Sequence, residues 1–398
     1  MKIALIENQR GSVRALLAAI GCVLLLAGCA NIARVPHTVE EQRQAEIPGF
    51  SGIRNWADDL GDVSHIINVS APRPTMLALS GGGPDGAFGA GFLTGWGHRG
   101  TRPEFDIVTG ASAGALIAPF AFLGEGYDSA LRDVFTSGEM NNFLQFQGVS
   151  GLFGTGLFNN APLQRLIARN VDEAMLAAVA REHNKGRRLF IVTTNLDAQR
   201  TAIWNMGKIA NSGQPNALQL FREIMEASAS VPGVFSPVLI NVEANGRRFA
   251  EMHVDGGITS NVLVVPESVL LQGQGIFPPN SKPTIYVLIN GRLDPNFEVI
   301  KPNTLRIAIR AFMTSVHSNT RNTMLASYQF ARRQGWNFYV AAISSDFTEP
   351  DQMNFDPAYM NALFDYGYER GRQGQMWQRS PADSRERRAE QRSQAARQ

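Results

Sequence analysis

Short apolar runs rich in β-branched residues alternate along the chain with longer stretches of helical periodicity. The strand-type runs cover residues 75–80, 105–109, 189–194, 201–204, 249–254, 284–290 and 338–343. The helical patterns cover residues 87–96, 115–118, 161–170, 172–185 and 217–229, and a further one includes residues 305–316. Strands that alternate with helices are typical of a mainly parallel sheet covered on both faces. The pattern therefore predicts an α/β fold, a three-layer sandwich around one central sheet.

Two of the helical patterns have a distinctive face. In residues 87–96, Gly91 and Gly95 fall four apart, which places them on one side of a helix and permits close approach of another backbone. In the later pattern, apolar residues recur on one face between Leu305 and Val316. This spacing predicts a face that packs in the core.

The N-terminal residues have the pattern of an export signal. Lys2, Arg10 and Arg14 precede an apolar run at residues 15–27, which is shorter than the roughly 20 residues that a membrane-spanning helix needs. The small residues before Cys29 are similar to the lipobox of bacterial lipoproteins, in which the cysteine is acylated and becomes the first residue of the mature chain. A plain secretory signal, or a buried helix that contains a cysteine, is the alternative.

Acylation of Cys29 would fix both the location and the cysteine chemistry of the mature chain. Cys22 would leave with residues 1–28, the lipoprotein signal peptide, so no cysteine would remain for a disulfide. Several acyl chains hold a protein stably on a membrane, whereas one is marginal. Because Ala30 and not aspartate follows Cys29, the chain resembles lipid-anchored proteins of the bacterial outer membrane. The sequence does not indicate which face of that membrane the chain occupies.

Composition divides the rest of the chain into three parts. Residues 29–71 show no sustained periodicity and are interpreted as an N-terminal tether. Residues 72–371 contain the alternating strand and helix patterns and form the candidate catalytic domain. Residues 372–398 are rich in Arg, Gln, Ser and Ala with few large apolar residues, and are expected to form a disordered polar tail.

Overall composition describes a globular protein. Of the 398 residues, 44% are hydrophobic and 18% are charged, and the formal net charge is +2. The first 28 residues contain three basic side chains and one acidic side chain, so the remainder is near neutral. Nothing in this balance indicates a nucleic-acid partner.

The most distinctive motif is Gly110-Ala111-Ser112-Ala113-Gly114. A strand-type run precedes it and a helical run follows, which is the strand–turn–helix context of a nucleophile elbow. In such an elbow the serine occupies a strained turn, and a β-carbon on either flanking residue would collide with the neighbouring strand or helix. The five-residue pattern alone also fits an ordinary strand-to-helix turn.

The strand-type run 75–80 leads directly into Gly81, Gly82 and Gly83. With Gly86 they match the spacing of a dinucleotide-binding fingerprint, but no acidic partner follows about 20 residues later in the proper context. A flexible turn is a second interpretation. The third is an oxyanion hole, in which N–H groups of a glycine-rich loop at a helix N-terminus face a developing negative charge. Two successive strand–turn–helix units, one with donors and one with a nucleophile, favour the third interpretation.

A serine nucleophile requires a base within hydrogen-bond reach. Asp255, in Asp255-Gly256-Gly257, stands at the end of the strand-type run 249–254, where an α/β fold places catalytic groups. His253 lies two residues earlier and would face the same side of the strand. A His253 base oriented by another acid is therefore the main rival to Asp255, and a plain Asp-Gly hairpin turn is the other alternative.

The glycine loop, the serine motif and the Asp-Gly-Gly sequence, in this order on an α/β pattern, resemble the patatin-like phospholipase family. Residues 227–237 (ASASVPGVFSP) are similar to a further segment of that family, and the resemblance covers roughly residues 75–290. It implies a Ser–Asp dyad that hydrolyses acyl esters of lipids without a metal or other cofactor. By position, it assigns the nucleophile to Ser112, the base to Asp255, and the oxyanion donors to Gly81, Gly82 and Gly83.

Two positions depart from the family's pattern. Many members have aspartate before the glycines and arginine or lysine two residues after them, whereas this chain has Ser80 and Asp85 there. The departure removes a basic side chain from the neighbourhood of the loop, but it leaves the backbone N–H groups intact.

The sequence thus predicts a serine-dependent lipid acyl hydrolase of phospholipase A, lysophospholipase or esterase type, with membrane lipids or lipid esters as substrates. One alternative is a catalytically silent, membrane-anchored lipid-binding scaffold. Others are a serine hydrolase with a Ser-His-Asp triad that acts on non-lipid esters, and a serine peptidase or acyltransferase with the same elbow. The sequence does not indicate the head group, acyl position, chain length, oligomeric state or protein partners.

Overall fold

The computed structural model describes residues 34–60, 69, 71–143, 156–273, 275–278, 281–295, 297, 299–300, 302–348, 355–374 and 377–381. The strands are β1 (Arg54–Trp56), β2 (Thr75–Leu79), β3 (Ile107–Ala111), β4 (Arg188–Asn195), β5 (Arg200–Asn205), β6 (Val238–Ala244), β7 (Arg247–Asp255), β8 (Thr284–Ile289) and β9 (Asn337–Ala342). The helices are α2 (Val39–Gln44), α4 (Gly86–His98), α5 (Ala113–Leu123), α6 (Asp128–Thr136), α8 (Ala161–Asn170), α9 (Glu173–Asn184), α10 (Met206–Ala210), α11 (Ala217–Ala229), α12 (Glu267–Gln272), α13 (Thr304–Arg333) and α14 (Pro357–Gln373).

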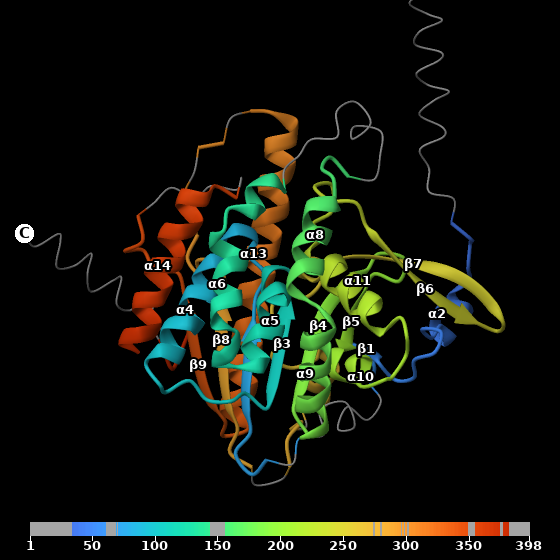
Figure 1. Ribbon diagram of the computed structural model, residues 1–398, viewed down its shortest axis with the longest axis horizontal. Helices are drawn as coiled ribbons and strands as arrows, with labels where there is room; N and C mark the ends of the chain where they lie inside the picture. The colour runs from blue at the N-terminus through green and yellow to red at the C-terminus, as the bar shows by residue number, and fades with distance from the viewer. Residues whose placement is uncertain are drawn as a thin grey trace, which may run out of the picture.

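The strands form one sheet in the order β1-β5-β4-β3-β2-β8-β9 (Figure 1). Strands β4, β3, β2, β8 and β9 run parallel to one another, and β1 and β5 are antiparallel additions at one edge. The hairpin of β6 and β7 joins through an antiparallel pairing of β7 with β4. The predicted α/β class with a mainly parallel central sheet is confirmed.

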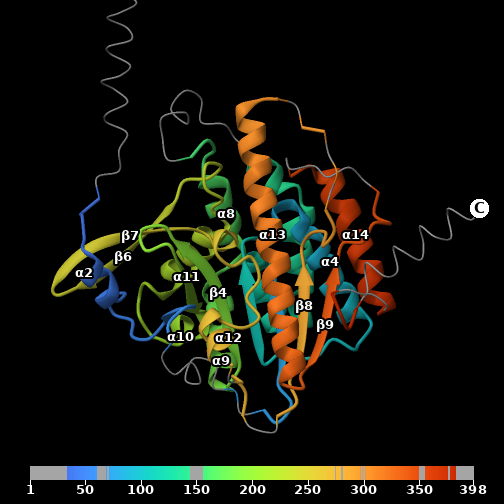
Figure 2. The same cartoon turned by 180° about the vertical axis from the view of Figure 1, so that it is seen from behind.

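Helices cover both faces of the sheet. Leu77 and Leu79 of β2 face a core shared with α4, α5, α11 and α14, while Met76 and Ala78 face a second core shared with α12 and α13. Figure 2 shows the second layer, with α12 and α13 in front of the sheet. Both faces of β2 are therefore buried, which explains why the strand reads as a continuous apolar run.

The glycine face of α4 is occupied by α14. A β-carbon on Gly91 would lie 2.0 Å from the carbonyl oxygen of Phe364, and one on Gly367 would lie 2.3 Å from that of Phe88. Both helices therefore need glycine where their backbones meet, as the spacing of Gly91 and Gly95 predicts for α4.

Part of the segment interpreted as a tether folds against the domain. Strand β1 pairs with β5, with Arg54 opposite Trp204, and α2 precedes it. Residues 1–33, which include the proposed signal peptide and Cys29, lie outside the described residues. Among the helices that the structure describes, none is long and apolar enough to span a membrane.

Residues 372–374 and 377–381, which the sequence assigns to a disordered tail, have defined structure. Helix α14 ends at Gln373, and Trp377 packs with its ring centroid 5.1 Å from Phe92 and 5.0 Å from Trp96. Gln378 forms a β-bridge with Val340 of β9. The described residues of this stretch thus pack on α4 and pair with β9, and residues 382–398 lie outside the described residues.

The N-terminal half of α13 does not pack in the core. Ile309, Phe312 and Val316 are only half-buried and belong to neither core, whereas Met324 and Phe330 in the C-terminal half are buried in the second one. The expectation of a core-packing face over residues 305–316 is therefore wrong. This half of the helix extends past the sheet that the C-terminal half covers (Figure 2).

Candidate active site

Ser112 and Asp255 come together because two strands end beside the same neighbour, β4. Strand β3 pairs with β4 as far as Ala111 opposite Val192, and β7 takes over at the next residue with Asp255 opposite Thr193. Ser112 follows Ala111 directly, so it lies where the two strands meet end to end. Asp255 arrives on an antiparallel hairpin strand, not at the end of a parallel strand that leads into a helix.

Ser112 has the backbone of a strained turn. Its φ is 52° and its ψ is −123°, and it immediately precedes the first residue of α5. For a residue with a side chain, such a conformation costs of order 1–3 kcal/mol and persists only where the surroundings impose it. The side chain is buried with 7% exposure. The described geometry is that of a nucleophile elbow.

The glycines that flank the elbow are sterically required. A β-carbon on Gly110 would lie 2.4 Å from the carbonyl oxygen of Gly114. A β-carbon on Gly114 would lie 2.5 Å from the carbonyl oxygen of Leu79 in β2. Because these contacts involve backbone atoms, no side-chain rotation relieves them.

The segment at residues 227–237 fixes the backbones of both candidate catalytic residues. Ser228 Oγ accepts the Ser112 N–H at 3.0 Å and donates to the Val192 carbonyl at 2.6 Å. The Asp255 N–H donates to the Ser230 carbonyl at 2.9 Å. The sequence marked this segment only by resemblance, and Ser228 and Ser230 were not identified as supports.

The Asp255 carboxyl is buried beside the serine hydroxyl. Its Oδ1 accepts the Gly257 N–H at 2.7 Å, while Oδ2 is buried and has no hydrogen-bond partner in the described part of the chain. Burial raises the pKa of Asp255 to about 7, and the Ser112 hydroxyl and the Gly257 N–H oppose this rise because they favour the carboxylate. Oδ2 is thus the acceptor available to the Ser112 hydroxyl, a contact that commonly tightens only with substrate.

The glycine loop lies against Ser112. A β-carbon on Gly81 would lie 2.8 Å from Ser112 Cβ, and one on Gly82 would lie 1.9 Å from the Asn290 carbonyl oxygen. The Gly81 N–H donates to the Asn261 carbonyl at 3.0 Å, so it is already engaged. Within the described ranges, the N–H groups of Gly82 and Gly83 donate to no other group. Of the three expected oxyanion donors, Gly82 and Gly83 are therefore available, and Gly81 is not.

The two positions that depart from the family pattern have structural partners. Ser80 Oγ donates to the Gly81 carbonyl at 2.7 Å and accepts the Asn290 N–H at 2.8 Å. The Asn290 side-chain amide donates back to the Ser80 carbonyl at 2.6 Å. Asp85 accepts the Tyr359 hydroxyl of α14 at 2.6 Å. Ser80 therefore holds the glycine loop, and Asp85 links the start of α4 to α14.

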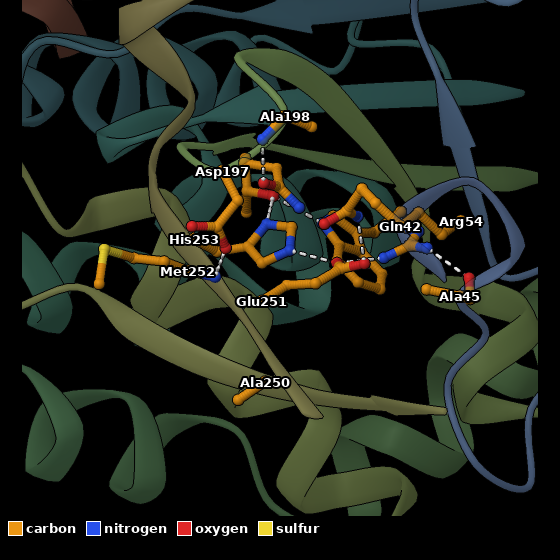
Figure 3. Close-up of polar contacts among 12 residues, drawn as sticks. Gln42, Ala45, Arg54, Asp197, Ala198, Ala250, Glu251, Met252 and His253 are labelled. Carbon is orange, nitrogen blue, oxygen red and sulfur yellow. Dashed lines mark hydrogen bonds and ion pairs between the residues drawn. The ribbon is translucent and has the colours of Figure 1, made fainter. Parts of the chain in front are cut away.

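Both ring nitrogens of His253 contact groups other than Ser112, and Figure 3 shows the contact with Glu251. Nδ1 lies 2.9 Å from Thr193 Oγ1, and Nε2 lies 3.0 Å from Glu251 Oε2. Trp204 Nε1 donates to Thr193 Oγ1 at 2.8 Å, so the Thr193 hydroxyl donates onward to Nδ1 and the proton sits on Nε2. Burial lowers the pKa of His253, which keeps the ring neutral. The geometry gives the rival base no acceptor for the serine proton.

Among the residues that the structure describes, no group of three or more His, Cys, Asp or Glu side chains is arranged to hold a metal ion. The polar groups at the site are the ones named above: a hydroxyl, a carboxyl and backbone amides. These groups are suited to acyl transfer through a serine ester.

A family model for patatin-like phospholipase matches residues 77–267. These residues form a patatin-like phospholipase domain. The patatin-like domain includes the glycine loop, Ser112 and Asp255, and the match to this family supports lipid acyl hydrolase activity in general. A comparison with curated proteins found no match.

Among solved structures, VipD from Legionella pneumophila is similar to this chain at 12% sequence identity and a TM-score of 0.38. The similarity covers 78% of this chain and 68% of that one. A likeness at this score carries no argument about the site, so the assignment of the patatin-like domain rests on the family model and on the geometry.

Proposed function

We propose that the patatin-like domain hydrolyses acyl esters of lipids with Ser112 as nucleophile and Asp255 as general base. The observation that carries the proposal is the strained serine beside a buried carboxyl, one of whose oxygens has no other partner in the described residues. A carboxyl whose pKa is about 7 is well matched to accept and return a proton near neutral pH.

In the proposed acylation, Ser112 Oγ attacks the ester carbonyl carbon while its proton passes to Asp255 Oδ2. The negative charge on the carbonyl oxygen is stabilised by the N–H groups of Gly82, Gly83 and Ala113. Ala113 begins α5, and the first amides of a helix have no acceptor within their own helix. The sequence did not single it out, although the residue after an elbow nucleophile commonly serves this role.

In the second half of the proposed reaction, the protonated Asp255 gives its proton to the leaving alkoxide, and the acyl group stays on Ser112. Water then attacks the acyl-enzyme carbonyl, Asp255 takes one proton from the water, and the fatty acid is released as Ser112 regains its hydrogen. The same two amides of the glycine loop and that of Ala113 stabilise the second oxyanion.

The proposed location follows from the sequence alone. Residues 1–28 would be removed as a lipoprotein signal, Cys29 would be acylated, and the domain at residues 72–371 would be held on the bacterial outer membrane. The proposed substrates are lipids of that membrane or lipid esters that reach it.

Replacing Ser112 tests the proposal against the silent scaffold. We expect Ser112→Ala to abolish release of fatty acid from phospholipid vesicles and from a soluble short-chain ester, with unchanged thermal unfolding. Ser137→Ala, at an exposed serine, is the matched control and should retain full activity. A Ser112→Ala protein with wild-type turnover on either substrate would refute the proposed nucleophile.

A further inference from the structure

The charged side chains of helix α13 are all arginines. Its 30 residues contain five arginines and no aspartate or glutamate. The electrostatic effect is visible at His317, whose pKa is lowered first by burial and then by Arg321 and Arg310. A helix that combines cationic side chains with an apolar side is typical of segments that lie on an anionic membrane surface.

The same helix starts far beyond the candidate active site. Thr320 Oγ1 accepts the Asn261 side-chain amide at 2.8 Å, and the Asn261 carbonyl holds the Gly81 N–H. Thr320 therefore marks the level of the glycine loop along α13. Ile307 precedes it by 13 residues, which corresponds to about 20 Å of helix. Figure 2 shows this N-terminal half standing above the upper ends of β8 and β9.

Several large apolar side chains at and just before this end of α13 are exposed in the described part of the chain. Phe297 is 90% exposed and Val299 is 81% exposed in the connection from β8 to α13, and Ile307 is 53% exposed on the helix itself. Met313, two turns further on, is 37% exposed. Single exposed apolar residues are ordinary, but a group of them on one protruding feature marks an interaction site. We call Phe297, Val299, Ile307 and Met313 the apolar projection.

We propose that the apolar projection inserts into the surface of an anionic phospholipid membrane and turns the end of the sheet that carries the active site toward it. This inference rests on the proposed function, because it supplies the step that brings a membrane lipid to the buried Ser112. Arg310, in the N-terminal half of the helix, would attract the anionic head groups, while the phenylalanine and aliphatic side chains enter the acyl boundary.

The charge of α13 also argues against a second copy of the chain as the occupant. A two-fold symmetric contact places the same patch of both subunits face to face. Here it would bring together two helices that carry arginines and no acidic side chain, which like-charge repulsion opposes. An anionic lipid surface removes that conflict.

A fluorophore at the projection tests the insertion without depending on turnover. The chain has two cysteines, Cys22 and Cys29, so Cys22→Ser and Cys29→Ser leave a background for one engineered thiol. An NBD label on Phe297→Cys should show a blue shift and a rise of at least about twofold in emission with vesicles that contain phosphatidylglycerol. The same label on Leu271→Cys, a site on α12 that is 69% exposed, should not respond.

Rates of hydrolysis on two substrates provide a second test of the insertion. Phe297→Ser/Ile307→Ser should reduce fatty-acid release from phosphatidylglycerol-containing vesicles by about tenfold or more, with turnover of a soluble short-chain ester within about twofold of wild type. Leu271→Ser should change neither rate. Salt should weaken wild-type action on these vesicles more than on pure phosphatidylcholine.

Three results would overturn the inference: an NBD label at position 297 that ignores anionic vesicles, an equal loss on both substrates, or a change of oligomeric state in the double variant. A wild-type protein inactive on both substrates whose label still enters the membrane would refute the proposed function and leave this inference standing.

Discussion

At the scale of single residues, Asp255 has two features that destabilise the fold and that are unusual in a purely structural side chain. Its carboxyl is 3% exposed, and one oxygen lacks a hydrogen bond in the described residues. No cation is among the groups that shift its pKa, which burial raises to about 7. Strongly perturbed groups of this kind cluster at functional sites.

The pKa of Asp255 makes a prediction about stability. The folded protein holds this proton up to about pH 7, while the unfolded chain releases it near the ordinary aspartate pKa of 3.8, so folding takes up a proton between these values. The contribution of Asp255 to stability therefore falls as pH rises through this window. Asp255→Asn removes the titration. The unfolding free energy of the variant minus that of wild type should therefore rise by up to about 4 kcal/mol between about pH 4 and about pH 8.

Denaturant unfolding at both pH values measures this difference. Asp197→Asn is an informative contrast, because hydrogen bonds from Arg34 and Met252 outweigh burial and lower the pKa of Asp197. The stabilisation by Asp197 is therefore lost only as pH falls below the ordinary carboxyl pKa of 3.8, and the difference between Asp197→Asn and wild type should change little between about pH 4 and about pH 8. An Asp255→Asn effect that is independent of pH would contradict the raised pKa.

Motifs in the sequence single out Ser112 and Asp255 as candidates, but they do not show which groups hydrogen-bond to the backbone around them. The local pattern shows three glycines and does not show that the Gly81 amide is taken by Asn261, which is distant in the chain. In the same way, Ser228 supports Ser112 only because α11 ends beside β4. Such pairings arise from the fold as a whole, so a one-dimensional pattern does not contain them.

At the scale of elements, periodicity identified strands and helices but not their partners. The apolar face between residues 305 and 316 was assigned to the core because the core is the usual destination of such a face. In the structure the sheet does not extend far enough to cover it. Likewise, the run 249–254 was correctly predicted as extended, yet its antiparallel pairing depends on β6 and on the far end of β4.

The element that ties the N-terminal segment to the site is β1, through a buried ion pair. Arg54 binds the Glu251 carboxylate on β7, with side-chain exposures of 7% and 0%, and also donates to the Ala45 carbonyl at 2.6 Å. Glu251 accepts the Gln42 amide at 2.6 Å and the His253 ring N–H. Figure 3 shows this network beside the strand that ends at Asp255.

Removing one partner of this pair should be costly. Arg54→Met leaves the Glu251 carboxylate buried without its cation, and a loss of about 3–5 kcal/mol in unfolding free energy is expected. The matched control is Arg248→Met, whose partner Glu243 lies at 3.0 Å on the surface with side-chain exposures of 79% and 39%, and it should cost no more than about 1 kcal/mol. Equal losses in denaturant unfolding would show that the buried pair does not fasten β1 to β7.

At the scale of the whole molecule, the candidate site lies at the carboxyl-terminal ends of the parallel strands. That end of the sheet carries the glycine loop after β2, the elbow after β3 and the N-terminal half of α13 (Figures 1 and 2). The α/β class and the layering could be predicted from the alternation of strands and helices. The end-to-end meeting of β3 and β7 could not, because it depends on how three separate segments share β4.

We propose that Asp255 activates Ser112, and this activation should appear in the pH dependence of covalent labelling. We expect a fluorophosphonate to modify one serine, identified as Ser112 by mass spectrometry of the digested protein. The labelling rate should rise with pH through a midpoint near 7, the pKa of Asp255, because the carboxylate must be free to take the proton. In Asp255→Asn the rate should fall by at least about a hundredfold and lose this midpoint. An adduct on another serine, or an unchanged pH profile in Asp255→Asn, would contradict the account.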